Sequence, residues 1–136
     1  MNIQPYLFFN GHSEAAIEHY KKALGAEVVR LSRFGDNPGP PMGPKVTKEK
    51  IMHADIRVGD THILISDGQC GGATSFDGFS LAVTANSEAD ADKKFAALAD
   101  GGKITMPLAQ TFFAKRYGQV SDRFGVHWMV LFGSQG

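Results

Sequence analysis

The sequence predicts an α+β fold in which two βαβββ modules form a curved mixed sheet around a concave cavity, with the helices on the outside. Strand-like alternation and helical spacing occur in the order strand, helix, three strands, and this order occurs twice. At 136 residues the chain fits one domain, with module 1 at about 1–68 and module 2 at about 78–136. A helix covers only one face of a four-stranded unit, so two units are expected to join and enclose a ligand site.

The elements of the first module are marked by apolar spacing and by turn residues. Ile17, Tyr20 and Leu24 recur at helical spacing, and Gly25 follows them as a helix terminator. The expected elements are a strand over residues 3–9, a helix with Ser13 as its N-cap, a strand over 26–34, and a hairpin of strands 50–58 and 61–67 joined at Gly59-Asp60.

A proline-rich and glycine-rich segment follows the second predicted strand. Residues 35–44 contain four prolines and three glycines, which cannot support a regular ladder of hydrogen bonds. The loop over residues 35–49 is either a flap over a site, a dimer contact or a plain surface connection.

The second module repeats the order. Phe79, Leu81 and Val83 alternate with small polar or apolar residues, as in a half-buried strand over 79–84. The other expected elements are a helix that Ser87 caps together with Asp90 and that Gly101-Gly102 ends, and three strands within 103–132 broken at Gly118 and at residues 122–125.

Charge and cysteine content narrow the possible partners and compartment. The chain has 14 Lys and Arg against 14 Asp and Glu and a pI near 7.0, so no positive field favours nucleic acid or anionic lipid. No apolar run has the length of a membrane helix or the form of a secretion signal. The lone Cys70 cannot form an internal disulfide, which favours the reducing cytoplasm. Its thiol is expected to be unreactive.

Several segments carry a family resemblance that spans nearly the whole chain. With the paired βαβββ order, Ser-Glu-Ala-Ala-Ile-Glu-His-Tyr at 13–20 ahead of Leu24-Gly25 resembles the vicinal-oxygen-chelate superfamily of glyoxalases, bleomycin-resistance proteins and dioxygenases. Resemblance to its PhnB-like branch rests on Pro5-Tyr6-Leu7, Lys50-Ile51-Met52-His53-Ala54, Ile65-Ser66-Asp67, Thr111-Phe112-Phe113 and Ser121-Asp122-Arg123-Phe124-Gly125-Val126-His127-Trp128. Phe113-Ala114 departs from the Trp-Gly often found in that branch. The resemblance implies a homodimer.

The resemblance also identifies positions at which a divalent metal would be held. Catalytic relatives use one side chain from each of four strands, and the matching positions here are Gln4 or Pro5, Leu64, Phe79 or Ser80, and Met129. A hard cation needs several oxygen or nitrogen donors, so the usual metal site is expected to be absent, and no cofactor is expected.

Strand alternation selects the candidate site residues. His62 shares a face with the second of these positions and His127 with the fourth, so the two histidines form a metal pair or an acid and a base, or else have only a structural role. Arg116 near the tail loop either counters an anionic ligand or is solvated. His53 and Asp55 share a face and are interpreted as surface pairing. The expected ligand-binding residues are His62, Leu64, Ser66, Ser80, Phe113, Arg116, His127 and Met129.

Three hypotheses about function follow. The preferred one is a homodimer that binds a planar or apolar small molecule without the usual metal, since the many aromatic residues suit such a ligand. The second is a lyase, isomerase or dioxygenase-type enzyme that uses His62 and His127, either without metal or with a displaced metal that Gln4 also holds. The third is a structural dimer with a collapsed cavity. Some PhnB-like proteins carry a methyltransferase label, but no strand here leads through a Gly-rich turn into a helix that would hold such a cofactor.

Overall fold

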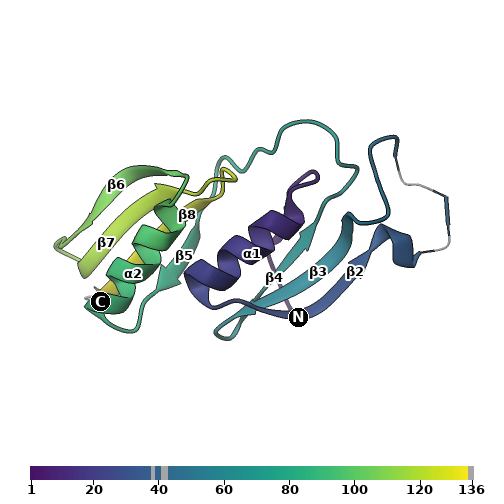
Figure 1. The fold of residues 1–136 in the computed structure, drawn as a ribbon. Helices are drawn as coiled ribbons and strands as arrows, with labels where there is room; N and C mark the ends of the chain where they lie inside the picture. Colours follow the sequence, from purple (N-terminus) through teal and green to yellow (C-terminus); the bar gives the residue numbers. More distant parts are fainter. Residues whose placement is uncertain (38, 41–42, 135–136) are drawn as a thin grey trace. The chain divides into compact units, whose positions relative to one another are not determined.

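The computed structural model describes residues 1–37, 39–40 and 43–134, and the chain forms two compact units, Met1–Thr74 and Ser75–Gly136. Each unit has the order strand, helix, three strands, which confirms the predicted duplicated α+β fold. Along the chain, the boundary between the units falls within the glycine-rich segment that was predicted to separate the modules, and Figure 1 shows each unit with its own helix and strands.

The first unit contains sheet A, in which the four strands lie in the order β1-β4-β3-β2. β1 and β4 are parallel, whereas the other neighbours are antiparallel. Helix α1 lies along this sheet (Figure 1). The elements are β1 (Tyr6–Phe8), α1 (Ser13–Leu24), β2 (Glu27–Arg33), the short 3-10 helix η1 (Phe34–Asp36), β3 (Ile51–Val58) and β4 (Thr61–Ser66).

The second unit contains sheet B, with the equivalent strand order β5-β8-β7-β6. Its one parallel pair is β5 with β8, which matches β1 with β4 in the first unit. Helix α2 lies along this sheet (Figure 1). The elements are β5 (Leu81–Thr84), α2 (Glu88–Ala99), β6 (Lys103–Ala109), β7 (Ala114–Ser121) and β8 (His127–Ser134).

Strand alternation puts one face of each sheet against its helix. In sheet A the buried strand residues Leu7, Ile56 and Ile65 form a core with Ile17 and Tyr20 of α1. In sheet B the buried residues are Val120, Trp128 and Val130 on the strands and Ala91, Phe95 and Leu98 on α2. The opposite face of each sheet has no helix of its own unit, as the sequence predicted.

The first residues of β1 and α1 differ from those predicted. β1 begins at Tyr6 because Pro5 has no backbone N–H to donate, although its carbonyl accepts from Leu64 N at 2.9 Å. The N-cap of α1 is His12, and Ser13 is the first helical residue. The prediction that Gly25 ends this helix is confirmed, because it adopts a left-handed conformation with φ 69°.

The second unit confirms the cap of α2 and corrects two other predictions. Ser87 accepts a hydrogen bond from Asp90 N at 3.0 Å, as expected for an N-cap. Gly118, predicted to break a strand, lies inside β7, where the ring of Phe95 and the backbone of Leu108 leave no room for a side chain. Phe79 precedes β5 and does not begin it.

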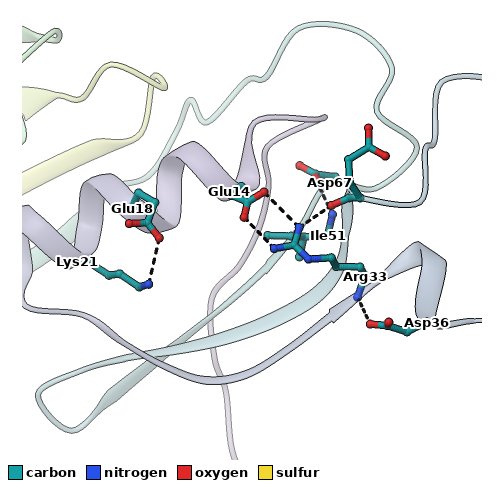
Figure 2. A network of polar contacts seen from close by, with 8 residues as sticks. Glu14, Glu18, Lys21, Arg33, Asp36, Ile51 and Asp67 are labelled. Carbon is teal, nitrogen blue, oxygen red and sulfur yellow. Dashed lines mark hydrogen bonds and ion pairs between the residues drawn. The ribbon is translucent and has the colours of Figure 1, made fainter.

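Asp67 is the main polar anchor of the first unit. Its carboxylate is only 1% exposed and accepts three backbone hydrogen bonds, from Gly11 N and Ser13 N at 2.9 Å and from Ile51 N at 2.8 Å. A side chain after β4 therefore caps the start of α1, since His12 provides no side-chain cap. Figure 2 shows Asp67 beside Ile51, with Arg33 reaching from the end of β2 to Glu14 on α1.

A second buried carboxylate has a similar role in the second unit. Asp122 accepts from Phe124 N at 2.9 Å and from Val126 N at 3.1 Å, and its other oxygen accepts from Trp128 Nε1 at 2.8 Å. These bonds hold the turn between β7 and β8 and satisfy the buried indole. The predicted break at residues 122–125 is confirmed.

Backbone hydrogen bonds join the two ends of the loop over residues 35–49. Phe34 N donates to Lys50 O at 3.0 Å, and Gly35 N donates to Lys48 O at 2.9 Å. Pro38, Pro41 and Met42 of this segment lie outside the described residues, and a lid or dimer-contact role stays a prediction. In the described part of the chain, no helix has the length and apolar character needed to cross a membrane.

Candidate functional site

The face of sheet A that points away from α1 brings together aromatic and titratable side chains. We call it the open face of sheet A and define it by Tyr6, Phe8, His53, Asp55, His62 and Leu64. Paired strand residues share a face, and the register places Leu64 between Tyr6 on β1 and Asp55 on β3. The rings of Tyr6 and Phe8 are stacked, with centroids 5.0 Å apart, yet remain 39% and 52% exposed.

Two hydrogen-bonded pairs cross this face. His62 Nδ1 lies 2.7 Å from Asp55 Oδ1, and Tyr6 Oη lies 2.9 Å from His53 Nδ1. Partial burial raises the pKa of Tyr6 more than its hydrogen bond with Ser66 lowers it, so the phenol stays protonated at neutral pH. His53 and Asp55, interpreted from sequence as a pair, each have a partner on another strand.

Sheet B has a corresponding open face, defined here by Tyr117, Gln119, His127, Met129 and Leu131. Neighbouring strands place Tyr117 opposite Leu131 and Gln119 opposite Met129. Gln119 Nε2 donates to Tyr117 Oη at 2.9 Å, and His127 Nε2 lies 3.3 Å from Asp77 Oδ1. The ring of Phe113 packs edge-on against Tyr117 at 4.9 Å, which adds a further aromatic surface.

Two of the predicted ligand-binding residues, Arg116 and Ser80, lie outside the two open faces, and a third, Ser66, is buried. Arg116 lies on the helix-covered side of sheet B, 3.4 Å from Glu88 and 3.5 Å from Asp92 of α2, because its place in β7 alternates with Tyr117. Ser66 lies opposite Phe8 on the open face of sheet A, but it is buried and its hydroxyl accepts from Gly68 N at 2.9 Å. Ser80 is exposed ahead of β5. His62 and Leu64 share the open face of sheet A, and His127 and Met129 share that of sheet B.

The residues at the positions of the usual divalent metal do not fit a metal. Leu64 offers only hydrocarbon and Met129 only a soft thioether, while at the third position Phe79 has no donor atom and Ser80 only a hydroxyl. Gln4 lies before β1. Nowhere in residues 1–37, 39–40 and 43–134 do three or more His, Cys, Asp or Glu side chains gather as a metal-binding group.

Two other polar side chains, Cys70 and Arg123, are held in ways that do not favour a role in a site. Burial raises the pKa of the Cys70 thiol, and nearby Asp67 adds to the effect, so the reactive thiolate is disfavoured. Arg123 is held beyond the end of α2, where it donates to the Asp100 carbonyl and carboxylate at 3.1 Å.

The paired βαβββ units have the fold of a solved domain described as glyoxylase, bleomycin resistance protein and dioxygenase. A domain of that description from Frankia sp. EAN1pec shares the fold, with a TM-score of 0.65 at 18% identity over 100% of this chain and 94% of that one. The family model described as 3-demethylubiquinone-9 3-methyltransferase matches residues 1–131. The chain belongs to this family, whose members include PhnB-like proteins.

Similar proteins support the assignment along nearly the full length. YjdN of Escherichia coli is 35% identical over 138 residues, covering 96% of this chain and 94% of the relative. The crystal structure of PA1353 from Pseudomonas aeruginosa has a TM-score of 0.85 at 38% identity, with 99% of both chains covered. A PhnB protein from Bacillus cereus has a TM-score of 0.82 at 29% identity, covering 98% of this chain and 100% of that one.

Proposed function

We propose that this protein binds a planar, partly apolar small molecule on the open face of sheet A, without a divalent metal at the superfamily's usual positions. The observation that carries the proposal is the half-exposed stack of Tyr6 and Phe8 beside two hydrogen-bonded polar pairs. Ligand sites combine apolar and aromatic surface with a few oriented polar groups. The open face of sheet B, with Phe113, His127 and Met129, offers the same combination as a second ligand-binding surface.

The energetics favour an aromatic ligand over a purely polar one. A ring that covers Tyr6 and Phe8 removes apolar surface from water at about 25 cal/mol per Å². Stacking adds about 0.5–1.5 kcal/mol for each favourable ring pair. The imidazole of His62 and the phenol of Tyr6 then supply orientation, because their hydrogen-bonding groups are already held in place.

Removing the Phe8 ring is expected to weaken ligand binding about tenfold. A thermal-shift screen of planar phenols, quinones and polycyclic antibiotics is expected to give at least one compound that raises the Tm by several degrees at saturation. Isothermal titration then compares Phe8→Ala with wild type. The control is Ile104→Ala, which removes a side chain of similar exposure, 49%, paired with Val120 of the helix-covered face of sheet B. No stabilising compound, or equal affinity in both variants, would contradict the proposal.

Metal analysis of the purified protein distinguishes metal-free ligand binding from a metal-dependent enzymatic activity. We expect the ligand affinity to be unchanged by EDTA and the purified protein to hold no stoichiometric transition metal. Stoichiometric zinc, nickel, manganese or iron that is lost in a His62→Ala, His127→Ala double variant would favour the enzyme instead.

We do not propose for this chain the methyltransferase activity that the family description names. In the described part of the first unit, the strand-turn-helix segment is β1, residues 9–12 and α1, and the Asp67 carboxylate accepts from Gly11 N and Ser13 N there. These amides are therefore not available to an anionic cofactor group.

We propose a cytoplasmic protein whose partner is a small molecule and neither nucleic acid nor membrane, on the grounds of balanced charge and a single cysteine. We propose that it is a homodimer on the ground of the family resemblance alone. Native mass spectrometry with and without the ligand from the screen checks the dimer, and a monomer under both conditions would contradict it.

A further inference from the structure

One imidazole on the open face of sheet A is arranged to accept a proton. A carboxylate can only accept, so the 2.7 Å contact between Asp55 Oδ1 and His62 Nδ1 places the hydrogen on Nδ1. Nε2 of neutral His62 then carries a lone pair. The side chain of His62 is 32% exposed, so a ligand can reach it, whereas Asp55 is the more buried partner at 21%.

One of the two arginines near this pair is not held in an ion pair by any described residue, and its charge favours an anionic ligand. Arg57 lies opposite His62 on β3, and its guanidinium is held 2.7 Å from Glu27 of β2. Arg30 of β2 lies opposite Asp55 on the same face and has no ion-pair partner among the residues that the structure describes. The other titratable groups of the open face, His53 on β3 and Tyr6 on β1, are bonded to each other. Arg30 is therefore a cation of this face that no described carboxylate holds at ion-pair distance.

We propose that the open face of sheet A binds a planar ring that bears an acidic hydroxyl, a phenol or an enol, and takes its proton at His62. In this step the ligand O–H bond breaks, its electron pair stays on the ligand oxygen, and a new N–H bond forms at Nε2. Asp55 stabilises the resulting imidazolium, and Arg30 faces the ligand anion. Tyr6 and Phe8 hold the ring. This inference rests on the proposed function and names its ligand class.

The ionisation of a coloured phenol tests the proposal directly. The probe is 4-nitrophenol, whose anion is yellow, titrated with pH in the presence of saturating protein, while equilibrium dialysis measures binding separately. We expect the bound probe to ionise at a pH about one unit below that of the free probe, a tenfold change in its ionisation constant. His62→Gln and Asp55→Asn are each expected to remove most of that shift. His12→Gln, a histidine exposed at the start of α1, is expected to retain it.

The outcomes distinguish this inference from the proposed function. Binding of 4-nitrophenol that depends on Phe8, but with no change in its ionisation, would overturn the proton transfer and leave the small-molecule site intact. An equal shift in His62→Gln and in wild type would also overturn it, as would a failure of the probe to bind. Thermal unfolding of Asp55→Asn and His62→Gln verifies that both variants are folded. A loss of ionisation in a folded Asp55→Asn variant that still binds the probe supports a positioning role for Asp55.

Discussion

Replacing Asp67 by alanine is expected to lower the free energy of unfolding by about 3 kcal/mol or more. The carboxylate satisfies three backbone N–H groups, those of Gly11, Ser13 and Ile51, in a site that is almost free of solvent. A buried donor that loses its acceptor costs about 1–3 kcal/mol, and three are affected together. Losses of this size are uncommon for single substitutions, which makes the result diagnostic.

Urea denaturation followed by circular dichroism measures the free energy of unfolding that Asp67→Ala loses. Two further variants test whether the lost backbone hydrogen bonds are the cause. Asp67→Asn keeps an oxygen for Gly11 and Ser13 but turns an amide nitrogen toward Ile51 N, so an intermediate loss is expected. Asp36→Ala is the matched control, because among the residues that the structure describes its exposed carboxylate accepts only from Arg33 N, at 2.8 Å. A loss of about 1 kcal/mol or less is expected. Equal losses for Asp67→Ala and Asp36→Ala would show that the buried anchor has no special role.

The order of the elements could be predicted from local signals because each element has its own turn or cap chemistry. Ser87 and Gly25 act through hydrogen bonds or backbone conformations within a few residues, so the sequence around them contains the whole cause. The cap of α1 could not be found in this way. Its acceptor, Asp67, is more than fifty residues away, and only the folded sheet brings it to the start of the helix.

The candidate site was predictable where strand alternation applies and not where it fails. His62 and Leu64 lie on the expected open face, because the two-residue turn at Gly59-Asp60 fixes the hairpin register. That register pairs Arg57 with His62 and puts Asp55 diagonally across from it, so the Asp55–His62 pair could have been found by following the register. The parity of Arg116 relative to Met129 could not be counted from sequence, since Gly118 was taken as a strand break.

The error at Gly118 shows why a glycine inside a strand is ambiguous. From sequence it indicates a turn, a bulge or a close approach of another segment. Here the cause is close approach. A Cβ built on Gly118 would lie 2.7 Å from Phe95 Cε1 of α2 and 2.9 Å from Leu108 Cα of β6, distances that packed atoms do not adopt. Nothing near Gly118 in the sequence identifies these two neighbours.

Gly118→Val is therefore expected to lower the free energy of unfolding by about 3 kcal/mol, and Gly118→Ala by about 1–3 kcal/mol. The Phe95 ring can tilt away, but the Leu108 backbone can move only by distorting β6. Gly71→Ala is the control, because this exposed glycine has only Gln69 O near its Cβ position, at 3.9 Å. A change of about 0.5 kcal/mol or less is expected there.

A double-mutant cycle with Phe95→Leu assigns the cause of that loss. Leucine lacks the ring atom that lies closest to the added Cβ, so Gly118→Ala should cost less in the Phe95→Leu background than in wild type. The rescue should be partial, because the contact with the Leu108 backbone remains in both backgrounds. Urea unfolding of the four proteins provides the coupling free energy. Strictly additive losses would mean that Phe95 does not limit the space at Gly118, and an unchanged stability of Gly118→Val would contradict the close packing of α2 against β7.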